Sequence, residues 1–258
     1  MELFGFPIWV VALVCAGVFC ASFVDAIGGG GGIISLPTYV LAGLPMHLAL
    51  GTNKLSSCLG TVVSTVRYIK NGYVDWSLAV PSMLLAIVGS YFGTKLHLSV
   101  NEEHLKFVLL FVLPVIAVIL LKRKDLPEQK RPLNHKLRCF IVCAVSLVFG
   151  VYDGFYGPGT GTFLLLGFCY LAGLDVRTAS GNVKIVNLSS NVGALITSLM
   201  ASKVVVPLGL LAAGFSVAGH YLGSGLAIKN GSKIVRPIIL VVILLLAVKV
   251  ILELLGLG

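Results

Sequence analysis

The sequence predicts an all-α polytopic membrane protein made of two inverted repeats, and three observations support this prediction. The 258 residues are 57% hydrophobic and only 11% charged, whereas about a quarter of the residues are charged in an ordinary soluble domain. The mean hydropathy is correspondingly high, at +1.02. Apolar stretches recur along the chain, and the second half repeats the first, so we expect roughly five segments per half and roughly 8–10 membrane segments in all.

The apolar segments divide the chain into two halves. A helix needs about 20 apolar residues to cross the bilayer core. In the first half, suitable segments lie at 7–27, 33–43, 47–69, 76–95 and 104–121. In the second half, they lie at 137–152, 162–173, 176–202, 205–228 and 234–255. The second segment of each half is short or broken. We therefore expect a first transmembrane repeat over 1–121, a basic linker over 122–136 and a second repeat over 137–258.

The repeat itself is visible at one offset of 130 residues. It relates Leu41-Ala42-Gly43-Leu44 to Leu171-Ala172-Gly173-Leu174, Gly51 and Lys54 to Gly181 and Lys184, and Gly89, Tyr91 and Gly93 to Gly219, Tyr221 and Gly223. Each copy has a glycine-rich break directly after an aspartate, Asp25 or Asp153. Paired repeats with interrupted segments at matching positions are typical of secondary transporters.

The distribution of basic residues predicts the topology. The net charge of +9 is concentrated in the linker between the halves, and short loops rich in Lys and Arg stay on the cytoplasmic side. With the linker inside, the loop at Arg67 and Lys70 and the loop at Lys229 and Lys233 also fall inside. If every short segment crosses the membrane, five crossings per half make the repeats inverted. If each short segment dips in and returns, four crossings make them parallel; we favour the inverted arrangement.

The glycine breaks are candidates for an anion site. Freed backbone groups are costly when they face lipid, so the breaks are expected to line a buried cavity, although they could instead allow close helix packing. A helix that starts after such a break directs N–H groups and a partial positive charge towards an anion. The predicted substrate-binding residues are Gly29, Gly30, Gly31, Gly32, Asn53, Lys54, Gly157, Gly159, Thr160, Gly161, Asn182, Lys184 and Asn187.

Lys54 and Lys184 occupy the same position of the two repeats, each before a strongly apolar run. A lysine at membrane depth needs a partner or a cavity, and we expect both to bind substrate; the alternative is a lysine that extends to the interface. Asp25 and Asp153 could carry a coupling proton, cap the glycine loop or pair with a lysine. His220 is more simply read as a packed membrane histidine than as a proton carrier.

Other functions find little support. The basic residues mark topology rather than nucleic-acid binding, and we find no nucleotide-binding, metalloprotease or hydrolase motif. Six cysteines lie in apolar segments without ligand spacing. Cys139 and Cys143, one helical turn apart, leave a redox role as a remote alternative. No enzyme activity, cofactor or metal is expected. The expected partners are a small anion and the lipid bilayer, with assembly into a homo-oligomer left open.

Two stretches of the sequence resemble the TauE/SafE family of sulfite and organosulfonate exporters. They are 25–54, where the glycine run leads to Leu36-Pro37, and 152–191, with Gly157-Pro158-Gly159-Thr160-Gly161. The resemblance implies a multi-pass permease of the bacterial plasma membrane for small sulfur-containing anions such as sulfite, thiosulfate or sulfonates. The residues themselves indicate an anion; only the resemblance indicates sulfur. We expect alternating access with proton coupling, and a passive anion channel is the alternative.

Overall fold

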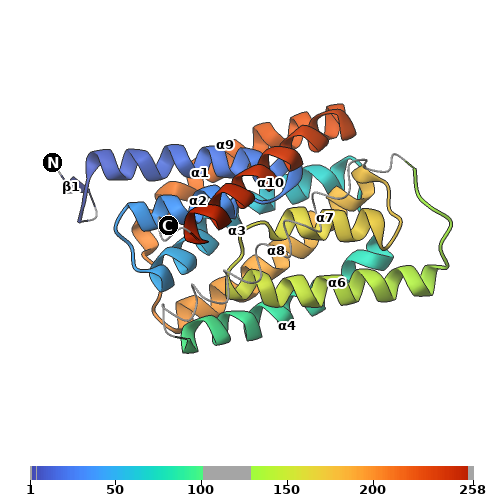
Figure 1. The fold of residues 1–258 in the computed structure, drawn as a ribbon, viewed down its shortest axis with the longest axis horizontal. Coiled ribbons are helices and arrows are strands. Elements are labelled where there is room, and N and C mark those ends of the chain that lie inside the picture. Colours follow the sequence, from blue (N-terminus) through green and yellow to red (C-terminus); the bar gives the residue numbers. More distant parts are fainter. Residues whose placement is uncertain (1, 4, 101–128, 255–258) are drawn as a thin grey trace.

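The all-α prediction is confirmed by a computed structural model, which describes residues 2–3, 5–100 and 129–254 (Figure 1). A minimal hairpin, β1 (Glu2–Leu3) and β2 (Phe6–Pro7), precedes the helices. The helices are α1 (Ile8–Gly28), α2 (Gly32–Leu41), α3 (Met46–Lys70), α4 (Trp76–Ser99), α6 (His135–Phe155), α7 (Thr160–Tyr170), α8 (Val176–Met200), α9 (Val206–Asn230) and α10 (Ser232–Leu254). The predicted segment 104–121 and linker residues 122–128 lie outside the described residues.

The protein is a multi-pass membrane protein, as its composition predicted. Within the described ranges, five helices are long and apolar enough to cross a membrane: α1, α4, α6, α8 and α9. Their outer faces carry large apolar side chains such as Phe92, Phe140 and Met200, each at least 60% exposed. Such faces suit lipid contact, because lipid removes the cost that water would impose on them.

The two short helices are return arms of hairpins. Along α1 and α2, Gly17 lies beside Thr38 and Gly31 beside Ala21, so α2 runs back along α1. Along α6 and α7, Gly167 lies beside Val145, and Arg138 Nε donates to the Ala172 carbonyl at 3.0 Å. Each pair therefore enters and leaves at the same end of the molecule, which is the chain direction expected when both of its segments are counted. Each short helix returns towards the end from which the preceding helix entered, because the glycine break reverses the chain.

The tips of the two hairpins meet in the middle of the molecule. Figure 1 shows α1 and α6 entering from opposite ends of its long axis. A Cβ added at Gly29 would overlap the backbone of Gly161, and Thr162 Oγ1 donates to the Gly28 carbonyl at 2.9 Å. Gly29 has a φ of 77°, a left-handed conformation that favours glycine. Glycine is thus required here both for the turn and for the backbone-to-backbone contact.

Two helices are exchanged between the halves. The fourth helix of the first half, α4, packs on α6 and α8, and its counterpart α9 packs on α1 and α3. The repeated glycines explain this packing: Gly93 lies against the Val151 carbonyl, and Gly223 lies against the Phe23 carbonyl. Small residues four apart let membrane helices approach closely. We call α1, α2, α3, α9 and α10 the first bundle, and α4, α6, α7 and α8 the second bundle.

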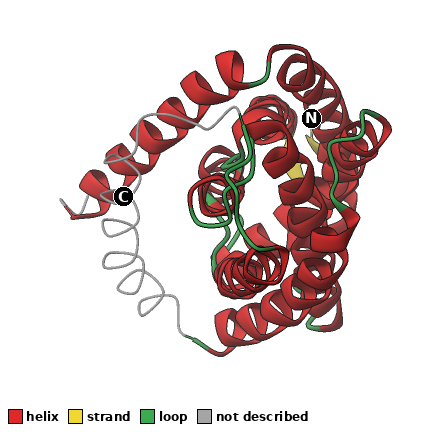
Figure 2. Cartoon of the chain, turned by 90° about the vertical axis from the view of Figure 1, so that its right-hand side faces the viewer, coloured by secondary structure: helices red, strands yellow, loops and turns green. Residues whose placement is uncertain are grey.

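One end of the molecule gathers the basic loops. Lys130 lies 3.9 Å from Asp75, which joins the end of the linker to the α3–α4 turn. Arg131 N–H donates to the Gly173 carbonyl in the α7–α8 turn at 2.9 Å, and the side chain of Arg177 lies beside Gly231 in the α9–α10 turn. The loops predicted to be cytoplasmic are therefore neighbours in space. Figure 2 looks onto this end, where loops join the helices.

Candidate functional site

A polar cavity opens where the hairpin tips meet. Its free space, including its mouth, is about 480 Å³. First-turn residues of both short helices reach it: Gly31, Gly32 and Ser35 at α2, and Thr160 and Gly161 at α7. The cavity therefore receives the positive ends of two helices, as the sequence predicted for an anion site.

Two buried ion pairs lie at this cavity, and each joins the two halves of the chain. Lys54 Nζ of the first half lies 2.7 Å from Asp153 Oδ2 of the second. Lys184 Nζ of the second half lies 3.0 Å from Asp25 Oδ2 of the first. Both lysine side chains are 3% exposed, so neither extends to the membrane interface. The four charges sum to zero, which satisfies the requirement that buried charges be paired.

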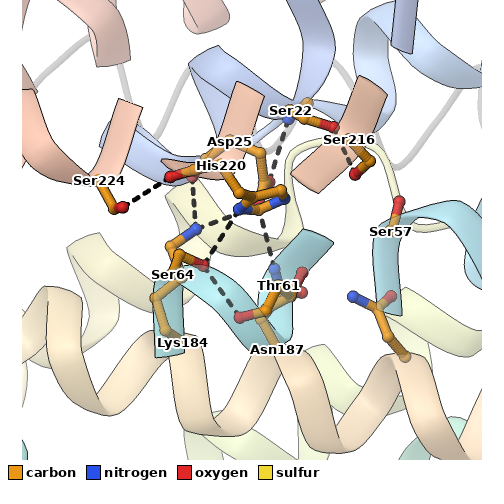
Figure 3. Close-up of polar contacts among 12 residues, drawn as sticks. Ser22, Asp25, Ser57, Thr61, Ser64, Lys184, Asn187, Ser216, His220 and Ser224 are labelled. Atoms are coloured by element: carbon orange, nitrogen blue, oxygen red, sulfur yellow. Dashed lines mark hydrogen bonds and ion pairs between the residues drawn. The ribbon is translucent and has the colours of Figure 1, made fainter. Parts of the chain in front are cut away.

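The Asp25 carboxylate also caps the glycine break. Its Oδ1 accepts from Gly31 N–H at 3.2 Å, while Oδ2 faces Lys184 and accepts from Asn187 Nδ2 at 3.4 Å. Lys184 Nζ also contacts the Asp25 carbonyl oxygen. His220 Nε2 lies 3.9 Å from the same Oδ2 (Figure 3). The capping and pairing interpretations of Asp25 are thus both confirmed.

The Asp153 carboxylate is held differently. Its Oδ2 accepts from Lys54 Nζ and from Ser190 Oγ, both at 2.7 Å. Lys54 also donates to Asn191 Oδ1 at 3.1 Å. The Asp153 side chain is 4% exposed, against 15% for Asp25. The first carboxylate is therefore the more open of the two.

The structure brings most of the predicted binding residues to this cavity. Those that line it are Gly30, Gly31, Gly32, Asn53, Lys54, Gly157, Thr160, Gly161 and Asn187, together with Asp25 and Asp153. Lys184 reaches it through Asp25. Three predicted residues lie elsewhere. Gly29 packs on the backbone of Gly161, Gly159 caps α7 in a left-handed conformation against Phe163, and the Asn182 amide donates to the Thr178 carbonyl within α8.

Other cavity residues were not among the predicted set. They are Val18, Ala21, Ser22, Ser35, Ser57, Asn191 and His220. Helical spacing could have found three of them, because Ser22 lies three residues before Asp25, Ser57 three after Lys54, and Asn191 seven after Lys184. His220 could not be assigned in this way, because its role depends on the contact of α9 with α1.

The described residues offer no group of three His, Cys, Asp or Glu side chains placed to hold a metal ion. Cys139 and Cys143 are free thiols, half-buried on α6. Among the described residues, the Lys–Asp pairs with buried lysines are the two at this cavity.

The fold and site define a class of protein: a multi-pass membrane protein whose broken helices meet at a charged cavity, which is the architecture of secondary transporters. The sequence profile of the family described as "Sulfite exporter TauE/SafE" matches residues 13–250, and the chain belongs to this family. The chain is 35% identical over 240 residues to "Probable membrane transporter protein ORF9" of Sinorhizobium sp., covering 93% of this chain and 92% of that protein.

Two further relatives have the same kind of name. "Probable membrane transporter protein YfcA" of Escherichia coli K12 is 32% identical, covering 89% of this chain and 85% of that protein. A "Probable membrane transporter protein" of Haemophilus influenzae is 30% identical, covering 93% of each. No solved structure matches the chain. The chain is thus a membrane transporter of the bacterial plasma membrane, and its relatives are named as transporters rather than enzymes.

Proposed function

We propose that this chain is a secondary transporter that moves a small oxyanion together with protons by alternating access. The single observation that supports this is the crossed pairing of Lys54 with Asp153 and of Lys184 with Asp25 at one cavity. The sulfur-containing class of substrate, namely sulfite, thiosulfate or a sulfonate, follows from the family to which the chain belongs.

The electrostatics of the cavity couple the anion to a proton. With both pairs closed, the lysines are neutralised, and only the two helix N-termini attract an anion. An anion about 4 Å from an ionised aspartate would be repelled by about 4 kcal/mol at an effective dielectric constant of 20. Protonation of the aspartate removes this repulsion and releases the lysine. The proton and the anion therefore bind together.

This linkage sets the number of protons carried with each anion and requires both to move in the same direction. One opened pair accepts one proton and one negative charge, so a monovalent anion moves without net charge. Proton and anion travel the same way, and the sum of their gradients decides whether the cell imports or exports the anion. A family named for export and a coupling that can also drive uptake are therefore compatible.

The moving units in this proposal are the two bundles rather than the two sequence repeats. Both ion pairs run between the bundles, since Asp25 and Lys54 belong to the first and Lys184 and Asp153 to the second. The contact of α3 with α8 and the meeting of the hairpin tips complete this interface. Opening a pair therefore loosens the same interface that must move.

The arrangement of the hairpins supports inverted repeats. α1 and α6 begin at opposite ends of the molecule (Figure 1). Equivalent contacts recur at the two ends: Gly51 lies against the Lys203 carbonyl and Gly181 against the Tyr73 carbonyl, and both pairs are related by the same 130 residues. In inverted repeats, a pseudo-two-fold axis relates two routes to one site, one from each side of the membrane, as alternating access requires.

Uptake by purified protein in proteoliposomes tests the proposed substrate class. We expect saturable uptake of labelled sulfite or thiosulfate, competition by organosulfonates, and little competition by chloride. Lys70→Ala, at the exposed end of α3 and away from the cavity, is the matched control for lysine loss. Non-saturating flux would instead favour a passive anion channel. Absence of flux for every sulfur-containing anion would reject the substrate class.

A further inference from the structure

The surroundings of the two ion pairs differ at two equivalent positions of the repeats. The 130-residue offset relates Ser90 to His220 and Gly60 to Ser190. At Asp153, the Ser190 hydroxyl donates to the carboxylate at 2.7 Å. At Asp25, the corresponding position is Gly60, and a Cβ there would collide with the His220 ring. The His220 ring and the Ser216 hydroxyl together thus fill the space at Gly60 that a serine side chain would need there.

The two carboxylates therefore differ in the lengths of their hydrogen bonds and in their exposure. Asp153 Oδ2 receives two donors at 2.7 Å. Asp25 Oδ2 receives Lys184 at 3.0 Å and Asn187 at 3.4 Å, with His220 Nε2 at 3.9 Å. Charge-assisted hydrogen bonds are typically about 2.7–2.9 Å long, so the contacts of Asp25 are the looser set. Asp25 is also the more exposed carboxylate, at 15% against 4%.

We infer that the two ion pairs have different functions: Asp25–Lys184 is the pair that opens during transport, with His220 passing the proton to and from Asp25, and Lys54–Asp153 stays closed as a pivot between the bundles. This inference rests on the proposed proton-coupled function and assigns its steps to residues. His220 is 2% exposed and borders the cavity, so water there can reach its ring.

The proton step balances within these groups. A hydronium ion in the cavity gives its proton to His220 Nε2, so that its O–H bond breaks as the N–H bond forms and neutral water is left. That N–H bond then breaks while an O–H bond forms at Asp25 Oδ2. The ring returns to its neutral form, and Lys184 is released to the anion. A distance of 3.9 Å exceeds a hydrogen bond, so the transfer needs an approach of about 1 Å or one bridging water. Deprotonation runs the same path backwards.

The surroundings of the pair contain few competing charges. Lys184 faces Asp25 from α8 and His220 faces it from α9. From α3, Ser64 Oγ contacts His220 Nδ1 at 3.0 Å, and Lys54 borders the same cavity. From α2 and α7 the neighbours are the backbone groups of Gly31 and Gly161. The α10 side chains that face the adjacent glycines are apolar: Ile238, Ile239 and Val242.

Infrared difference spectroscopy of the reconstituted protein tests the assignment without requiring transport. On acidification, a carboxylic-acid band should form in the wild type, be lost in Asp25→Asn and persist in Asp153→Asn. A band that is lost in Asp153→Asn instead, or that both variants retain, overturns the assignment. If the wild type carries none of the tested anions, the proposed function fails, yet this spectrum still decides between the two aspartates.

A residue exchange tests His220. A Cβ at Gly60 would also meet the Ser216 hydroxyl, which is equivalent to Ala86 in the other repeat, so the triple variant Gly60→Ser/Ser216→Ala/His220→Ser gives these positions the residues found at the Asp153 site. We expect uptake driven by a pH gradient to fall about a hundredfold, as for loss of a positioned proton-transfer group, while exchange of labelled for unlabelled anion at equal pH continues. His47→Gln, outside the cavity, is the control. Unchanged gradient-driven uptake in the triple variant would overturn the role of His220.

Discussion

Lys54 and Asp153 lie 2.7 Å apart although 99 residues separate them in the sequence, and the contact joins the two halves of the transporter. The reciprocal contact of Lys184 with Asp25 means that each buried lysine has its counter-charge in the other half of the chain. A cavity built in this way has no surplus charge when empty. In the proposed mechanism, a lysine becomes available to an anion when one of the pairs opens.

Lys54→Met is expected to destabilise the protein by about 3 kcal/mol, because it leaves Asp153 buried without its counter-charge. Adding Asp153→Asn should recover much of this loss, since the unpaired charge is then removed. Thermal unfolding of the protein in detergent measures both variants. Equal melting temperatures for Lys54→Met and the wild type would show that the buried pair does not stabilise the fold.

Lys184→Ala is expected to weaken apparent anion affinity about 10- to 100-fold, the loss of one charge-assisted hydrogen bond of about 1.5–3 kcal/mol. The concentration dependence of uptake gives this value. Lys70→Ala should leave it unchanged. If Lys184→Ala transports as fast as the wild type with the same apparent affinity, the paired-lysine site is wrong.

Gly93→Leu is expected to destabilise the protein by about 1–3 kcal/mol, because its side chain would enter the backbone contact of α4 with α6. Gly214→Ala is the matched control, because a Cβ at this α9 position meets nothing within 4 Å. In a helix, that change should be neutral or slightly stabilising. The yield of monodisperse protein and its melting temperature distinguish the two. Equal behaviour of both variants would contradict the glycine-mediated packing.

Single cysteines introduced in a cysteine-free background test the orientation. Asn71→Cys in the exposed α3–α4 turn should react with an impermeant maleimide only after the membrane is opened, because the basic end is expected to be cytoplasmic. Ser202→Cys in the exposed α8–α9 turn should react in intact cells. Labelling of both residues from the same side would refute the proposed topology.

The sequence predicted the helices better than their arrangement. The offset of 130 residues located the breaks, and most of the predicted binding residues reach one cavity, because polar groups between apolar helices have few other places to lie. The meeting of the two hairpin tips inside the molecule was not predicted, since length alone does not distinguish a full crossing from a hairpin arm.

The choice of ion-pair partners was also beyond sequence reasoning. Asp25 could have paired with Lys54 or Lys184, and only the three-dimensional arrangement of the helices shows that Lys184 is its partner. His220 was interpreted as a packing residue because it is a lone histidine in an apolar segment, whereas its ring contacts come from Ser64 on α3 and Asp25 on α1. Contacts that come from other helices leave no periodic pattern in the sequence of one segment.

The central claim is that a proton releases a lysine to bind the anion, and the measurement that tests it most directly is anion affinity and uptake as a function of pH. Labelled sulfite or thiosulfate is supplied to proteoliposomes with and without an acidic outer solution. Protonated Asp25 frees Lys184, so affinity should rise as the pH falls, and an inward proton gradient should accelerate saturable uptake. Affinity and uptake that are indifferent to pH and to the gradient would contradict the claim.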